Sequence, residues 1–204
     1  MIETAFRLVD RLARWAIWAA GMMILAAAVL ISVEVGLKGA LGISLRGAEE
    51  FSGYLFAIGT SWSLPFVLID RGNVRIDTLY MRLSLRARIA LDILSLLVFG
   101  AFMLVLAKTC WTLLVTSAQL DARSTTPLQT PQIYPQALWF AGIALFLVAL
   151  ALLLARCVQA LVRGAPADVG RIAGAPSMDE EIDRELQAIN QMTGGPVSGP
   201  AGKT

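Results

Sequence analysis

The sequence of 204 residues contains no histidine and only two cysteines. The lack of histidine excludes bis-histidine haem ligation, most zinc sites and a Ser-His-Asp triad. A glycine-rich phosphate-binding loop is also missing from the sequence. We therefore expect a protein that is not an enzyme and that holds no cofactor and no metal ion.

The two cysteines, Cys110 and Cys157, lie in two different apolar stretches. The topology derived below puts them at opposite depths in a membrane, too far apart for a disulfide or a shared cluster. We expect both to be small, buried apolar side chains.

Charged residues are scarce, at 16% of the chain, whereas apolar residues make up 57%. The apolar residues gather in four stretches, at about residues 15–37, 51–69, 89–116 and 137–158. A bilayer core of about 30 Å needs about 20 apolar residues in a helix, so each stretch can span it. The sequence predicts an all-α membrane protein with four transmembrane helices, in a membrane domain over residues 15–163.

Most of the basic residues outside these stretches lie on one side of them. Arginines are frequent in the N-terminal segment, in the second connection and just after the last stretch, and rare in the first and third connections. The positive-inside rule therefore places both termini and the second connection in the cytoplasm. Because this rule explains the arginines, we expect no nucleic-acid partner. Asp92 is expected at the membrane interface near Arg88.

The segments that flank the spans are predicted to contact the membrane surface or the cytoplasm. Residues 1–14 place apolar side chains on one side of a helix and arginines toward the other, which is typical of an amphipathic helix in the lipid headgroups. A similar pattern over residues 76–83 predicts a second interfacial helix. Residues 164–204 form a predicted cytoplasmic tail with a short helix at about 178–191 and a disordered remainder.

Few charges fall inside the predicted spans, where charge is costly and often functional. Glu34 and Lys38 are four residues apart on one helix face, so we expect them to pair near the interface. Lys108 lies deeper in the third span, and its side chain either extends to the interface or meets Glu34, Glu49 or Glu50. Structural pairing, contact with another protein and ion transport stay open as roles for these charges.

The second span has an unusual face of small residues. Gly53, Ala57 and Ser61 recur every four residues, a spacing that lets another helix approach closely. Trp62 lies near the middle of the membrane, away from the interfaces that tryptophan prefers. This face packs either inside the four-helix unit or against a separate subunit, and the sequence does not decide between the two.

Three runs of residues resemble one family. Arg46–Phe56, Arg71–Asp77 and Ser124–Pro135, in this order and spacing, are similar to runs in the small permease subunit of TRAP (tripartite ATP-independent periplasmic) transporters, the DctQ-like family. The similarity covers about residues 5–163. Members of that family often carry histidine where this chain has Asn73.

The resemblance implies a subunit of a sodium-coupled, binding-protein-dependent transporter for organic acids in the inner membrane of bacteria or archaea. The expected partners are a large permease subunit, which would hold the substrate and sodium sites, a periplasmic binding protein in transient contact, and membrane lipid. This chain would brace the large subunit. The residues expected at that contact and at the inner turn beside it are Glu49, Glu50, Gly53, Ala57, Ser61, Trp62, Arg71, Arg75 and Asp77.

One alternative belongs to another class of protein. A self-sufficient small exporter also has four spans and a carboxylate in its first span, which here would be Glu34. That carboxylate should lie near the middle of the membrane, whereas the sequence puts Glu34 near one end of its span. We therefore favour the transporter subunit.

Overall fold

The chain forms four long helices in a computed structural model that describes residues 2–71 and 84–164, and residues 169, 170, 172, 174, 186, 189 and 190. The helices are α1 (Ile2–Leu41), α2 (Ala48–Ile69), α4 (Leu85–Gln119) and α5 (Ile133–Val162). All four are long and apolar enough to cross a membrane. Each predicted span lies within one of these helices, so the prediction of an all-α protein with four transmembrane helices is confirmed.

Some predictions fall on parts of the chain that are not described. They are the second interfacial helix at 76–83, most of the tail helix at 178–191, and the residues Arg75 and Asp77. These remain predictions from the sequence, as does the cytoplasmic position of the two termini.

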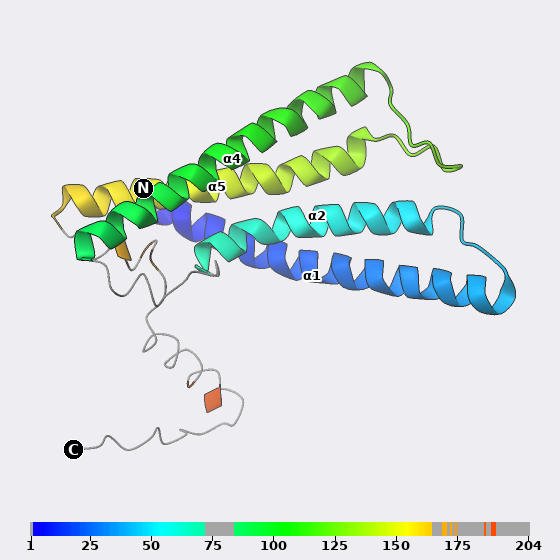
Figure 1. The fold of residues 1–204 in the computed structure, drawn as a ribbon, viewed down its shortest axis with the longest axis horizontal. Coiled ribbons are helices and arrows are strands. Elements are labelled where there is room, and N and C mark those ends of the chain that lie inside the picture. Colours follow the sequence, from blue (N-terminus) through cyan, green and yellow to red (C-terminus); the bar gives the residue numbers. More distant parts are fainter. Residues whose placement is uncertain are drawn as a thin grey trace.

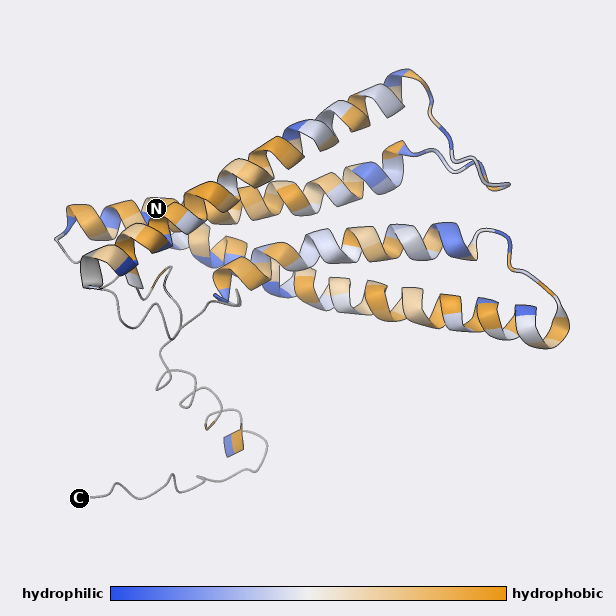
Figure 2. Ribbon diagram, viewed as in Figure 1, coloured by the Kyte–Doolittle hydropathy of each residue, from blue (hydrophilic) through white to orange (hydrophobic). Residues whose placement is uncertain are grey.

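The four helices form two antiparallel pairs, α1 with α2 and α4 with α5 (Figure 1). The central contact is between α2 and α5, while α1 packs on α2 and α5, and α4 packs on α5. The connections 42–47 and 120–132 lie together at one end, here named the connection end, and the N-terminus lies at the other (Figure 1). Toward the connection end α4 diverges from α5. Hydrophobic residues run along all four helices (Figure 2).

The predicted interfacial segment 1–14 and the first span belong to one continuous helix from residue 2 onward. Residues 2–14 are the first turns of α1, which continues unbroken to Leu41. No proline or glycine precedes Gly21, so nothing in the sequence ends the helix there. The apolar side of this segment is buried in the bundle, with Val9 and Ala13 only 7% and 0% exposed. This side of the segment therefore packs against the other helices, and its contact with the lipid headgroups stays a prediction.

The hydrophobic core lies mainly between α4 and α5 and extends toward the N-terminal end. Phe146 is fully buried, and its ring meets that of Phe99 edge-on at 5.1 Å between centroids. Cys110 and Cys157 are buried, unpaired thiols, as predicted. Asp92 is buried among the helices, at 1% exposure, and its predicted position at the membrane interface stays a prediction. The chain alone could not show this, since the burial of Asp92 depends on how α4 packs in the bundle.

Candidate subunit interface

Two small residues, Ser61 of the predicted small-residue face and Gly59 outside it, bring α2 close to its neighbours inside the unit. Ser61 is 2% exposed, and a Cβ added at Gly142 of α5 would lie 2.5 Å from its Oγ. On its other side α2 approaches α1 through Gly59, where an added Cβ would lie 3.1 Å from the carbonyl oxygen of Ala20. Such contacts need glycine because any side chain would separate the backbones. Ser61 therefore packs inside the four-helix unit.

Trp62 also faces α5. Its Nε1 donates a hydrogen bond of 2.9 Å to the backbone carbonyl of Leu138, and its ring lies against Gly142. A buried indole N–H commonly finds such a partner. The mid-membrane position of Trp62, unusual by the aromatic-belt rule, is explained by this contact between helices.

Replacing Trp62 with phenylalanine should lower the free energy of unfolding by about 1 kcal/mol, because a six-membered aromatic ring remains while the indole N–H that bonds to Leu138 is lost. The measurement is thermal unfolding of the purified chain in mild detergent. Trp18→Phe is the matched control, since Trp18 is 75% exposed. Equal stability of the two variants would contradict a structural role for the Trp62 bond.

The remaining members of that face lie on the surface. Gly53 and Ala57 are exposed, and a Cβ at Gly53 would meet nothing within 4 Å. With Phe56 and Thr60 they form the open α2 strip, one face of the helix at i, i+3, i+4 and i+7. The Thr60 hydroxyl donates a hydrogen bond of 2.8 Å to the backbone carbonyl of Phe56. The strip can therefore take a second helix without leaving that hydroxyl unbonded.

The neighbouring carboxylates Glu49 and Glu50 lie in different surroundings. Glu50 accepts hydrogen bonds from the hydroxyls of Tyr54, at 2.7 Å, and Thr126. The amide of Gln132 donates in turn to the Tyr54 hydroxyl, at 3.1 Å. This Glu50 network ties the start of α2 to the connection 120–132, whereas Glu49 is exposed.

The connection 120–132 is ordered by its own backbone as well. The Ser124 amide donates to the Thr130 carbonyl at 3.0 Å, so the chain folds back on itself. Its tip reaches the other connection, because a Cβ at Gly47 would clash with the side chain of Leu128. Gly47 has a φ of 90°, which only glycine adopts readily. The two connections thus form one packed end of the bundle.

Glu34 also contributes hydrogen bonds at the connection end. Its carboxylate accepts hydrogen bonds of 2.6 Å from the Ser44 hydroxyl and from the Leu45 amide. The structure thus gives Glu34 other partners than the predicted Lys38. Among the described residues, Lys38 and Lys108 form no ion pair with Glu34 or with the carboxylates that begin α2, and both lysines are exposed.

Arg71 follows the end of α2 at the opposite, N-terminal end. Its φ is 59°, and its side chain lines a cavity between α1, α2 and α5. Sequence reasoning missed several contacts described above, at Gly59, Thr126, Gln132 and Gly142. Only Gly142 carried a signal, because it is the single glycine of the last apolar stretch.

The fold and these surfaces define a polytopic membrane protein with a packed interior and open helix faces. Residues 27–160 match the family model of the DctQ component of tripartite ATP-independent periplasmic transporters. The match covers more than half of the chain, which therefore belongs to this family and is a small permease subunit of a TRAP transporter. The resemblance noted from the sequence is confirmed. Searches of curated proteins and of solved structures gave no match.

Proposed function

We propose that this subunit braces the large permease subunit of a sodium-coupled, binding-protein-dependent transporter for organic acids. The complex would lie in the inner membrane of a bacterium or archaeon, with both termini of this chain in the cytoplasm. The observation that carries the proposal is the open α2 strip. Gly53 and Ala57 have the small side chains that a closely packed helix needs, yet no part of the described chain covers them.

The exposed side of α4 supports the same role. This helix packs on α5, and it bears large exposed apolar residues such as Leu97 and Val105. Lys108 lies exposed on the same helix, some 11 residues before its end, or about 16 Å at 1.5 Å per residue. A cation at that depth is costly against lipid, so a polar group of a partner would stabilise it.

The proposal assigns the transport sites to the partner subunit. The described residues contain no group of three or more His, Cys, Asp or Glu placed to hold a metal ion. Glu34 and Glu50 hold the connections through hydrogen bonds. In this proposal the substrate and sodium sites belong to the large subunit, which receives substrate from the periplasmic binding protein.

The exporter alternative is disfavoured by the surroundings of Glu34. That mechanism needs a carboxylate accessible near the middle of the membrane, where it binds and releases ions. Here both oxygens of Glu34 accept hydrogen bonds from Ser44 and Leu45, at the end of the bundle.

The test is co-purification of the tagged chain from its native cell in mild detergent, with mass spectrometry of the bound proteins. A stoichiometric, larger polytopic protein is the expected result. Ala57→Leu should then reduce its yield several-fold, since overpacking of a close contact costs about 1–3 kcal/mol. Leu97→Ala on α4 should reduce the yield less. Equal yields would count against the open α2 strip, and isolation of the chain alone would refute the bracing role.

A further inference from the structure

We propose that Lys108 forms an ion pair with a carboxylate on a transmembrane helix of the large permease subunit, and that this helix packs along the exposed side of α4. The inference rests on the proposed bracing role and adds to it a second contact surface and the chemistry of the partner there. It depends on the depth of Lys108, on the spacing of the exposed residues around it and on the positions of the acidic residues in this chain.

The contacts between helices place Lys108 near the middle of the membrane. The 22 residues of α2 are about 33 Å long, close to the thickness of a bilayer core. Ser61 lies about 20 Å from the start of α2 and about 12 Å from its end, and it packs on Gly142 of α5. The next residue, Ile143, belongs to one buried cluster with Ala107, the neighbour of Lys108. The four-carbon stem of the lysine is too short to reach the headgroups from this depth.

The exposed residues around Lys108 have the spacing of a surface that packs on another helix. Six positions of α4 recur at intervals of four and three residues and are all exposed, and they are Leu94, Val98, Ala101, Val105, Lys108 and Thr112. Two helices pack over several turns at positions with this spacing. Leu96 and Met103, which are buried in the core, lie on the opposite side of α4. We name the six exposed positions the α4 seam.

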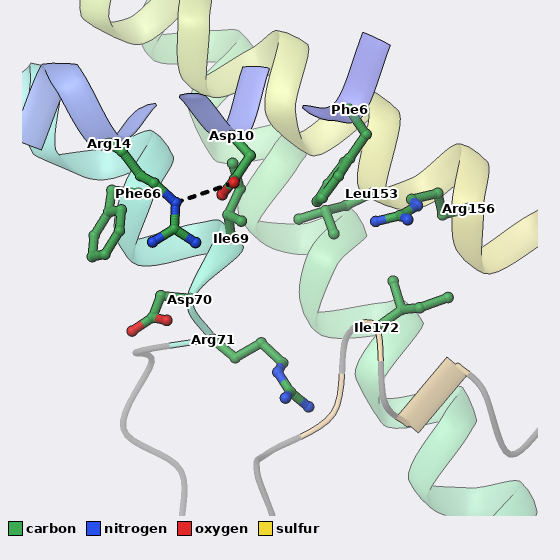
Figure 3. Close-up of a pocket in the computed structure, with 10 residues that line it drawn as sticks. All are labelled: Phe6, Asp10, Arg14, Phe66, Ile69, Asp70, Arg71, Leu153, Arg156 and Ile172. Carbon is green, nitrogen blue, oxygen red and sulfur yellow. Dashed lines mark hydrogen bonds and ion pairs between the residues drawn. The ribbon is translucent and has the colours of Figure 1, made fainter. Parts of the chain in front are cut away.

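The ammonium group of Lys108 lacks a partner of opposite charge in the part of the chain that the structure describes. The other polar group of the α4 seam is satisfied, because the Thr112 hydroxyl donates to the backbone carbonyl of Lys108 at 3.0 Å. Figure 3 shows the contrasting case of Arg14, which pairs with Asp10 at 3.1 Å within the chain. A charge that faces lipid at mid-membrane depth is costly, so a partner with the opposite charge stabilises this position.

The acidic residues of the four helices indicate that this partner is not a second copy of the chain. Copies of a membrane protein share one orientation, so a second copy would have to supply a carboxylate at the depth of Lys108. In α2 both glutamates lie in the first turn, and α5 has no acidic residue. Asp92 is buried and lies 16 residues from Lys108, and Glu34 accepts hydrogen bonds at the connection end. Glu3 and Asp10 precede the first predicted span.

A carboxylate matches this position better than other anions or neutral groups. Lipid phosphates lie at the headgroups, far from the middle of the membrane. A hydroxyl or amide would bond to the ammonium group but would leave its charge uncompensated in a medium of low dielectric constant. One polar residue in an otherwise apolar seam also specifies the register of the two helices. The ion pair therefore fixes where the partner helix lies along α4.

The test is co-purification of the large subunit with the tagged full-length chain from its native cell. Lys108→Met keeps an apolar stem and removes the charge, so it should lower the yield of the large subunit about tenfold or more, because the partner carboxylate is left buried and unpaired. Lys108→Glu should lower the yield further, since two carboxylates would meet. Lys108→Arg keeps the charge and should retain most of the yield.

Lys38→Met is the matched control, since Lys38 is an exposed lysine in the last turn of α1. It should leave the yield at the wild-type value. The unfolding temperature of the isolated Lys108 variants in mild detergent should not fall, because the described residues form no ion pair with Lys108. A lower yield at an unchanged unfolding temperature then reports the loss of the partner contact.

A photo-crosslinking amino acid at Val105, one turn from Lys108 in the α4 seam, identifies the partner helix. That helix should contain an aspartate or a glutamate. Its replacement by lysine should restore the yield of the Lys108→Glu variant. A crosslinked helix without a carboxylate would overturn the proposal.

The variants also separate this inference from the bracing role. Wild-type yields with both Lys108→Met and Lys108→Glu, together with a reduced yield with Ala57→Leu, would overturn the ion pair and leave the bracing role intact. If the wild type recovers no large subunit, the bracing role and the ion pair are both refuted. Recovery of only a second copy of the chain, lost in Lys108→Glu, would assign the α4 seam to self-association and contradict the proposal.

Discussion

Gly142→Ala is expected to lower the stability of the isolated subunit by about 1–3 kcal/mol, the usual cost of overpacking. The added Cβ would lie 2.5 Å from Oγ of Ser61 and 2.7 Å from its carbonyl carbon. The second atom belongs to the backbone, so α2 and α5 would have to separate. Thermal unfolding in mild detergent measures the effect. A thiol-reactive fluorophore can report it, because Cys110 and Cys157 are both buried.

Gly53→Ala is the matched control for this substitution. It introduces the same methyl group in α2, where nothing lies within 4 Å. Alanine also has a higher helix propensity than glycine by about 1 kcal/mol, so stability should stay the same or rise slightly. A Gly142 variant as stable as the Gly53 variant would show that α2 and α5 are not in close contact. Reduced recovery of the large subunit with Gly53→Ala alone would support the open α2 strip as the contact surface.

Glu50→Ala is expected to release the connection 120–132 from α2. The substitution removes the acceptor of the Tyr54 and Thr126 hydroxyls. Loss of a hydrogen-bonding partner by part-buried groups costs about 1–3 kcal/mol. Because local opening depends on this energy, cleavage by trypsin after Arg123 should become about tenfold faster or more. Arg123 lies in the connection with its side chain half exposed.

Glu49→Ala provides the comparison at the adjacent position. Glu49 has the same charge and lies in the same first turn of α2, but its side chain is exposed. Cleavage after Arg123 should proceed at the wild-type rate in this variant. Equal acceleration in both variants would mean that the charge at the start of α2, and not the Glu50 network, orders the connection.

The hydropathy of the chain was sufficient to predict the four helices. Whether a stretch such as 137–158 can span a membrane depends on its own length and composition, because lipid forces each segment to satisfy its backbone hydrogen bonds internally. Three runs of residues were likewise sufficient to suggest the family that the match over residues 27–160 confirms. The interfacial role of residues 1–14 stays a prediction, because a helix lying on lipid and one packing on protein have the same apolar periodicity.

Which polar and small residues face the interior was decided only by the tertiary structure. Ala57 and Ser61 are one helical turn apart on one face, yet Ala57 is exposed and Ser61 is buried against Gly142. Helices that cross at an angle are in close contact over only a limited length, and the sequence of α2 does not specify where α5 crosses it.

The partners of the charged residues could not be predicted from the sequence either. Periodicity paired Glu34 with Lys38, its neighbour on one helix, whereas the folded chain brings Ser44 and Leu45 to Glu34 through the turn that follows α1. The sequence by itself was sufficient to predict that this protein spans a membrane, where its helices lie and to which family it belongs. These properties follow from local composition and from the order of the motifs. The fold alone decided the pairing of Glu50 with Thr126 and the position of Arg71 at a cavity between α1, α2 and α5, since such contacts depend on how separate helices pack.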